Sequence, residues 1–125
     1  MKVISAEEVH KSLSYPELID SLQEAYGGNY SMPPRQVFLL DEDKGHEAFA
    51  VLPSWNEELI GVKAFTYFPG AEEPYKSLYS KILLFNRGHG EPLALVDGTS
   101  VTFWRTAGIS GLATRLLSRE DSETM

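Results

Sequence analysis

Hydrophobic residues near the N-terminus recur at helical spacing behind two possible helix caps. The motifs "SAEE" at Ser5 and "SYPE" at Ser14 both match the S-x-x-E capping box, in which a hydroxyl and a carboxylate cap free amides reciprocally. Behind the second motif, apolar residues follow at intervals of three and four up to Gly27-Gly28, a typical helix end. We therefore predict two helices within residues 5–27.

From Arg35 onward the pattern changes to short apolar runs separated by turn residues, which is typical of β-strands. An acidic turn at Asp41–Gly45 separates the first two runs, and the segment "RGHG" predicts a hairpin turn before the last one. The central run is apolar on both faces and needs cover on both sides. About five mainly antiparallel strands are predicted within residues 35–97, in the runs "QVFLL", "EAFAVLP", "LIGVKAFTYF", "SLYSKILLFN" and "EPLALVDG".

The Gly- and Ala-rich segment "GTSVTFWRTAGISGLAT" predicts a third helix, with Thr99 or Ser100 as its N-cap and an end near Leu117. Helices within 5–27, strands within 35–97, a helix over 99–118 and a short tail over 119–125 form an α+β order. A chain of 125 residues is expected to form a single domain, here over residues 1–125.

Composition narrows the possible functions. The chain has no cysteine, which excludes a disulfide framework and thiolate chemistry. Its net charge is −7 and no basic cluster occurs, so neither nucleic acid nor an anionic membrane is an expected partner. No apolar run is long enough to span a bilayer, and the first residues lack the apolar core of a signal peptide. These features suit a cytoplasmic protein.

Three cations nevertheless lie in apolar surroundings. Arg105 is the one charged residue between Gly98 and Thr114, and Lys63 lies within the apolar run "LIGVKAFTYF". Arg35 follows two prolines and precedes another apolar run. We expect Arg105 to be at least partly desolvated, because helical spacing puts it on the apolar stripe of Val101, Thr102, Gly108, Ile109 and Leu112.

Burying an unpaired charge costs several kcal/mol, so each cation needs an anion or several acceptors. Most acidic residues fall in the predicted helices and turns, and only Asp97 is placed to meet Arg105. An external carboxylate or phosphate would satisfy the three cations if they converge. The alternative is that each cation reaches the surface or pairs with one carboxylate of the chain.

Other chemistry finds little support. His10, His46 and His89 lack the spacing of metal ligands, and no metal is expected. Ser77 and Ser80 have no nearby His-Asp partners for nucleophilic catalysis. The only G-x-G, at Gly88, precedes a strand and not a helix, so it predicts a turn and not a dinucleotide loop.

The segments "PPRQVFLL", "LIGVKAFTYFPG" and "LLFNRGHGEPLALVDGTSVTFWRTAGISGLATRLL" resemble the N-terminal portion of the ornithine cyclodeaminase/mu-crystallin family. The resemblance extends from about Ser5 to Leu117. It implies the substrate-binding and dimerisation portion of an NAD(P)-dependent oxidoreductase acting on an amino or imino acid. The Rossmann domain of the family follows that portion and has no counterpart in these residues.

By the same resemblance, Arg35, Lys63 and Arg105 are substrate-carboxylate ligands, and Ser77 is a hydroxyl residue near the nicotinamide. Lys63 could also assist a proton transfer. Ornithine cyclodeaminase has a glutamate where this chain has Ala50, so the resemblance implies a substrate other than ornithine.

Two functions therefore stay open. The chain is either the substrate-binding and dimerisation portion of such an enzyme, truncated from it, or a non-catalytic chain, namely a stand-alone dimer that binds a small carboxylate or a degenerate remnant. In both cases we expect a homodimer, because the apolar strands leave a face to cover. We also expect the 125 residues alone to bind no cofactor and to be inactive, with NAD or NADP required by a full-length enzyme.

Overall fold

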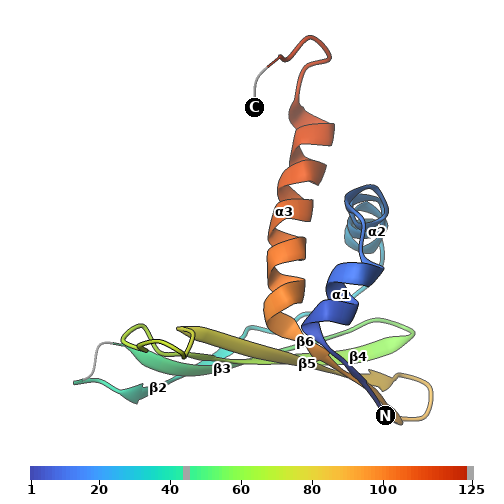
Figure 1. Cartoon of the computed structure of the whole chain (residues 1–125). Helices are drawn as coiled ribbons and strands as arrows, with labels where there is room; N and C mark the ends of the chain where they lie inside the picture. Colours follow the sequence, from blue (N-terminus) through green and yellow to red (C-terminus); the bar gives the residue numbers. More distant parts are fainter. Residues whose placement is uncertain (44–45, 124–125) are drawn as a thin grey trace.

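The computed structural model describes residues 1–43 and 46–123, and its α+β fold confirms the predicted class. One mainly antiparallel sheet carries all three helices on the same side (Figure 1). The elements in chain order are β1 (Lys2–Ile4), α1 (Ala6–Ser12), α2 (Tyr15–Gly27), β2 (Gln36–Asp41), β3 (Glu47–Trp55), β4 (Leu59–Tyr67), β5 (Leu78–Asn86), β6 (Pro92–Asp97) and α3 (Gly98–Leu117).

The sheet has six strands in the order β1-β6-β5-β4-β3-β2, one more than the sequence predicted. The additional strand is β1, which pairs parallel to β6 at the sheet edge. Its three residues are too few to show an alternating pattern. These residues form a strand because the backbone of β6 supplies their hydrogen-bonding partners.

The helix starts follow the predicted capping chemistry only in part. Ser5 and Glu8 form the capping box, with Ser5 N donating to Glu8 Oε2 over 2.8 Å and Glu8 N donating to Ser5 Oγ over 3.3 Å. Ser14 is the N-cap of α2, but its hydroxyl bonds the Glu17 carboxylate and no backbone amide. Neither Thr99 nor Ser100 caps α3, because the chain becomes helical directly after β6 and Asp97 takes that position.

The predicted turn at "RGHG" is confirmed as the β5–β6 hairpin. Gly90 has a positive φ of 78°, the left-handed conformation that glycine adopts without strain. The Asn86 side chain accepts hydrogen bonds from the amides of Gly88 and His89. Of the predicted acidic turn Asp41–Gly45, residues 44 and 45 lie outside the described residues, as do residues 124 and 125 of the predicted tail.

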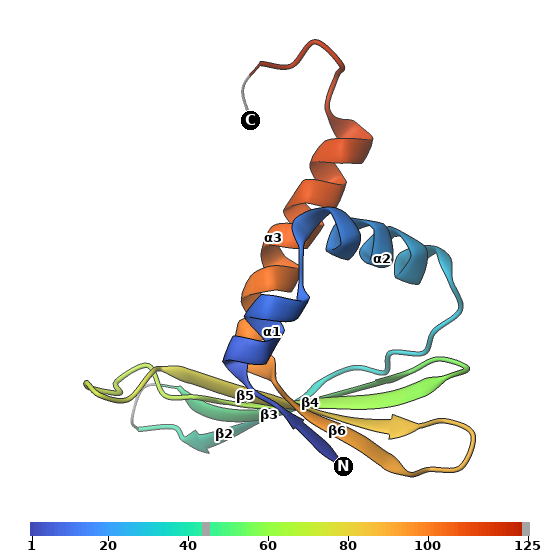
Figure 2. The same cartoon turned by 45° about the vertical axis from the view of Figure 1, so that its right-hand side comes forward.

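Helix α2 lies across α3 and packs against it through two glycines (Figure 2). A Cβ atom at Gly108 would lie 2.9 Å from Leu22 and 3.0 Å from Leu18, and one at Gly111 would lie 2.7 Å from Ile19. The apolar side chains of α2 therefore occupy the space that a larger residue on α3 would need. This contact holds the middle of α3.

The face of the sheet opposite the helices, here called the helix-free face, carries a continuous apolar row. Strand pairing places one residue of each of five adjacent strands side by side in this row, namely Pro53, Val62, Leu83, Leu95 and Val3. The chain exposes 9385 Å² in total. A compact protein of 14.0 kDa exposes about 6,700 Å², so the chain has a larger open surface than its mass requires, and Val3 of the row is 65% exposed.

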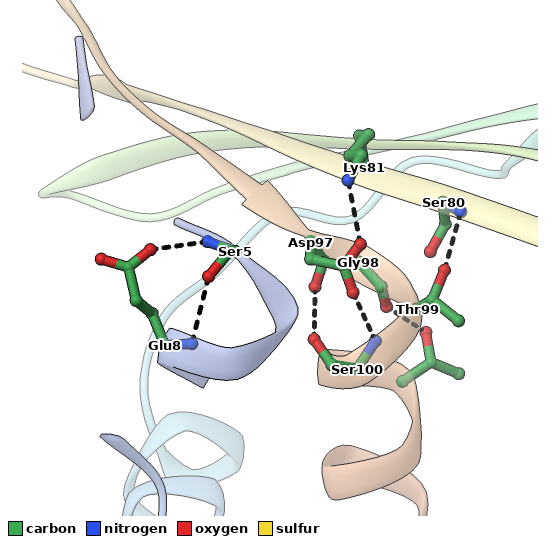
Figure 3. A network of polar contacts seen from close by, with 9 residues as sticks. Ser5, Glu8, Ser80, Lys81, Asp97, Gly98, Thr99 and Ser100 are labelled. Atoms are coloured by element: carbon green, nitrogen blue, oxygen red, sulfur yellow. Dashed lines mark hydrogen bonds and ion pairs between the residues drawn. The ribbon is translucent and has the colours of Figure 1, made fainter. Parts of the chain in front are cut away.

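The first turn of α3 rests directly on β5. Gly98 is buried, and a Cβ atom there would lie 2.6 Å from Ser80 Oγ and 3.0 Å from the Ser80 carbonyl carbon. Beside it, the Ser80 amide donates to Thr99 Oγ1 over 3.1 Å (Figure 3). The absence of a side chain at Gly98 thus sets how closely the helix approaches the sheet.

We predict that Gly98→Ala lowers the free energy of unfolding by about 1–3 kcal/mol, because its methyl group would overlap backbone atoms of β5 that cannot turn away. Urea denaturation followed by circular dichroism measures the change. Gly27→Ala is the matched control, since nothing lies within 4 Å of a Cβ atom there. Equal stability of Gly98→Ala and the wild-type chain would contradict the close contact.

Candidate functional site

Strand β4 places Lys63 in the middle of the sheet, on the face that carries the helices. Lys63 pairs with Leu52 of β3 and Ile82 of β5, and its side chain is half-buried. Its ammonium donates a hydrogen bond of 2.6 Å to Thr102 Oγ1 of α3 and lies 5.9 Å from the centre of the Phe65 ring. The lysine therefore bridges the sheet and the first turns of α3.

Helix α3 carries Thr102 and Arg105 three residues apart, so both occupy one side of the helix. Arg105 is exposed, and the prediction that it is desolvated was wrong. The apolar stripe is correct at Gly108 and Leu112, which are buried, but Arg105 reaches past it into solvent.

Lys63 and Arg105 are close enough to influence each other electrostatically. Burial lowers the pKa of Lys63 below its ordinary value, and the positive charge of Arg105 lowers this pKa further. Both effects disfavour the charged ammonium. A bound anion between the two cations would offset this repulsion.

The neighbouring residue Trp104 fixes the rotation of α3 about its axis. Its indole Nε1 donates to His10 Nδ1 of α1 over 2.9 Å, and its ring lies 4.7 Å from the ring of Tyr15. These contacts hold Trp104 against α1 and α2. Thr102 and Arg105 are thereby kept in a constant position relative to the sheet.

Arg35 is exposed and lies at the entry to β2, not in the apolar setting that its neighbours suggested. The next residue, Gln36, pairs with Val51, and the adjacent β3–β4 pair joins Leu52 to Lys63. Extending this register by one residue places Arg35 level with Lys63 but two strands away, roughly 10 Å across the sheet. Arg35 therefore lies near the Lys63–Arg105 pair without contacting it.

Asp97 does not meet Arg105 as the sequence suggested. Its carboxylate accepts from Lys81 Nζ over 2.9 Å and from the Ser100 amide over 3.0 Å (Figure 3). Burial acts to raise the pKa of Asp97, but these two partners outweigh it, and the pKa lies below the usual range. Across residues 1–43 and 46–123, no acidic side chain forms an ion pair with Arg35, Lys63 or Arg105.

Ser77 lies apart from the cations. It is exposed just before β5, where its carbonyl accepts from the Phe68 amide over 2.7 Å. The next residue, Leu78, pairs with Tyr67, which is four positions along β4 from Lys63. At 3.3 Å per residue this separation is about 13 Å, so the structure does not bring Ser77 to the cation pair.

Thr102 is a residue of the site that the sequence pattern did not predict. The available signal was a hydroxyl residue three positions before Arg105 on the same helix face. That signal is weak, because threonine is common in helices whose hydroxyls bond the helix backbone. Only the position of α3 over β4 in the folded chain shows that this hydroxyl contacts a lysine.

Within the part of the chain that the structure describes, no group of three or more His, Asp or Glu side chains could hold a metal ion. No described helix combines the length and the apolar character needed to cross a membrane. The glycines of "GHG" belong to the β5–β6 hairpin and do not open a helix, so they do not fit a dinucleotide phosphate.

On a sheet with helices on one side, a lysine and an arginine thus lie within electrostatic reach of each other, and no described carboxylate forms an ion pair with either of them. Residues 1–125 match the sequence profile of the ornithine cyclodeaminase/mu-crystallin family. The chain belongs to this family.

Individual relatives are similar over nearly the whole chain. The Delta(1)-pyrroline-2-carboxylate reductase of Colwellia psychrerythraea is 58% identical over 98% of this chain. The structure of the Thermococcus litoralis reductase of the same name, in complex with NADH and L-proline, is 31% identical over 98% of the chain with a TM-score of 0.84. An archaeal alanine dehydrogenase dimer with bound NAD is 27% identical over 98%, with a TM-score of 0.85. The chain spans 40%, 39% and 38% of these relatives, respectively.

The lowered pKa of Lys63 predicts a specific dependence of stability on pH. Between the folded-state pKa and the ordinary value of 10.5, the unfolded chain binds more protons than the folded chain, so stability rises with pH in this window. We expect the wild-type chain to gain stability relative to Lys63→Met as the pH rises from 7 to 10.5.

Urea denaturation of both proteins at several pH values measures this difference. Lys76→Met, which changes an exposed lysine of the β4–β5 connection, is the control and should follow the wild type at every pH. A pH-independent difference between Lys63→Met and the wild type would contradict the effect of burial.

Proposed function

We propose that the chain is the substrate-binding portion of an NAD(P)-dependent oxidoreductase acting on a small imino or amino acid. The observation that carries this proposal is that Lys63 and Arg105 lie close enough for the charge of one to lower the pKa of the other, while no described carboxylate forms an ion pair with either. Two cations within electrostatic reach of each other suit the two oxygens of a carboxylate, and guanidinium in particular binds it in a bidentate manner.

The surroundings of the pair favour a substrate without a second ammonium group. Ala50 has 0% exposure and lies between Val37 and Phe65 on the face that Lys63 shares. A buried alanine offers no counter-charge for the distal amine of a diamino acid. A cyclic imino acid such as Δ1-pyrroline-2-carboxylate, with proline as its reduced form, fits this setting, and the 58% identical relative carries the name of that reaction.

Arg35 and Ser77 have secondary roles in this proposal. Arg35, level with Lys63 and two strands away, approaches the carboxylate when the long arginine side chain extends across β3. Ser77 lies where a hydroxyl near the nicotinamide is expected from the family resemblance. The nicotinamide supplies the hydride when it is bound, whereas the residues of this chain bind and orient the substrate.

Titration of the 125-residue chain with pyrrole-2-carboxylate and L-proline, monitored by tryptophan fluorescence, tests the anion site. We expect Arg105→Ala to weaken binding about tenfold to 150-fold, which corresponds to the loss of a charge-assisted hydrogen bond of about 1.5–3 kcal/mol. L-Prolinamide, which lacks the carboxylate, should not bind, and L-ornithine should bind more weakly than L-proline.

Arg119→Ala is the matched control, because Arg119 is an exposed arginine beyond the end of α3. It should bind like the wild type. Equal affinity of wild type and Arg105→Ala would argue against the proposed site. Carboxylate binding that favours no substrate of the family would instead indicate a non-catalytic carboxylate-binding module.

We further propose that the chain forms a homodimer through the helix-free face. The open surface exceeds that of a compact chain of this mass by about 2,700 Å², well above the roughly 800 Å² that each partner contributes to a standard interface. The apolar row is continuous over five strands, and Val3 at its end is 65% exposed. The 27% identical archaeal relative is described as a dimer.

We expect Leu83→Glu to shift the protein from dimer to monomer in light scattering at micromolar concentration, because it places a charge in the middle of the apolar row. Val3→Glu, at an exposed edge position, should weaken the dimer without affecting the fold. Leu117→Glu at the tip of α3 is the control, with 83% of this residue exposed. A wild-type chain that is monomeric under these conditions would refute the proposal.

A further inference from the structure

The hydroxyl of Thr102 can act only as an acceptor toward Lys63. Its single proton is donated to the carbonyl oxygen of Gly98, four residues earlier, over 2.7 Å. The ammonium of Lys63 has only protons to offer and donates one of them to Thr102 Oγ1 over 2.6 Å. The hydrogen bond to the α3 backbone therefore fixes the orientation of the Thr102 hydroxyl, and with it the direction from which Lys63 donates its proton.

The other neighbours of Lys63 do not hold its amine. Leu52 and Ile82, its partners in the register, are apolar, and Arg105 repels the positive charge. The Phe65 ring is 5.9 Å away, at the limit of a weak attraction. Among the described residues, Thr102 is the one hydrogen-bond acceptor of the ammonium. Without it, a flexible lysine beside a cation would turn toward solvent.

We propose that Thr102 is a positioning residue, which holds the amine of Lys63 beside Arg105 and directs its remaining hydrogen-bonding positions to the substrate. This inference rests on the proposed function for its biological meaning, but not for its physical test. A charged Lys63 has two N–H groups left after it bonds Thr102, and a neutral Lys63 has one N–H group and a lone pair. In either state the hydroxyl fixes where these groups point.

Helix α3 contains a close internal control. The hydroxyls of Thr106 and Ser110 bond carbonyl oxygens four residues earlier, as Thr102 does, over 2.7 and 3.2 Å. Thr106 is exposed, and no lysine among residues 1–43 and 46–123 forms a hydrogen bond with it. Thr106→Val therefore removes the same helix hydrogen bond as Thr102→Val and leaves the contact with Lys63 intact.

Nuclear magnetic resonance of the lysine ammonium groups in the 15N-labelled chain tests the positioning directly. A hydrogen-bonded ammonium exchanges its protons with water more slowly than a free one, and Lys63→Arg assigns the signal by its loss. We expect a protected Lys63 signal in the wild type, Thr102→Ser and Thr106→Val. In Thr102→Val the exchange should be at least about tenfold faster, with Thr102→Ala as the second variant if valine disturbs folding.

A protected Lys63 signal in Thr102→Val and Thr102→Ala would overturn the inference, and so would an equal loss of protection in Thr106→Val. A wild-type chain without a protected Lys63 signal would also overturn it, because the hydrogen bond would then not persist in solution. None of these results depends on whether the chain binds a carboxylate.

The pH dependence of pyrrole-2-carboxylate binding gives a second readout. Acceptance of a hydrogen bond by Thr102 favours the charged form of Lys63, so its loss should lower the pH at which binding declines on the alkaline side. Thr102→Ser should restore the wild-type profile. If Lys63 is protected but the wild type binds no carboxylate at any pH, the proposed function fails while the positioning role stands. If binding occurs with an identical pH profile in Thr102→Val, the positioning role fails.

Discussion

The close contact between the first turn of α3 and strand β5 determines the geometry of the whole site. Gly98 lies against Ser80, and Asp97 caps the helix while it binds Lys81. With no loop between β6 and α3, the helix begins where the sheet dictates. Thr102 is one turn further along, and it can reach Lys63 only because this turn is seated so closely. The packing of a residue without a side chain thus governs whether the lysine of β4 meets the hydroxyl of α3.

The cation pair is costly for the fold. Lys63 is half-buried beside Arg105, and both burial and the neighbouring charge act against its ammonium. A chain with a net charge of −7 has many carboxylates that could relieve this, yet the nearest one in sequence, Asp97, is engaged at the helix cap. Natural proteins accept such local conflicts mainly at functional sites. The same conflict explains why a small carboxylate would stabilise the folded chain as it binds.

Much of the fold could be predicted from local patterns, because helix caps, the β5–β6 turn and the apolar strand runs are encoded in neighbouring residues. The confirmed capping box at Ser5 and the hairpin at Gly90 are of this kind. Strand β1 and the N-cap of α3 depend on β6, a partner that the local sequence does not show. In the site, Lys63 was recognised from its apolar strand. The exposure of Arg105 and the contact of Lys63 with Thr102 depend on how α3 is rotated about its axis. That rotation is held by the hydrogen bond between Trp104 and His10, which are 94 residues apart in the sequence.

The length of α3 gives its base a mechanical importance. Its 20 residues extend about 30 Å, and α2 holds it at Gly108, at Gly111 and through the ion pair of Arg115 with Asp20. Because α2 is attached almost to the last turn of α3, the two helices would move together if the first turn rotated. A rotation of about 10° there would displace the last turn by about 5 Å. A displacement of α2 would in turn reorient the first turn of α3, and with it change the distance between Thr102 and the lysine of the sheet.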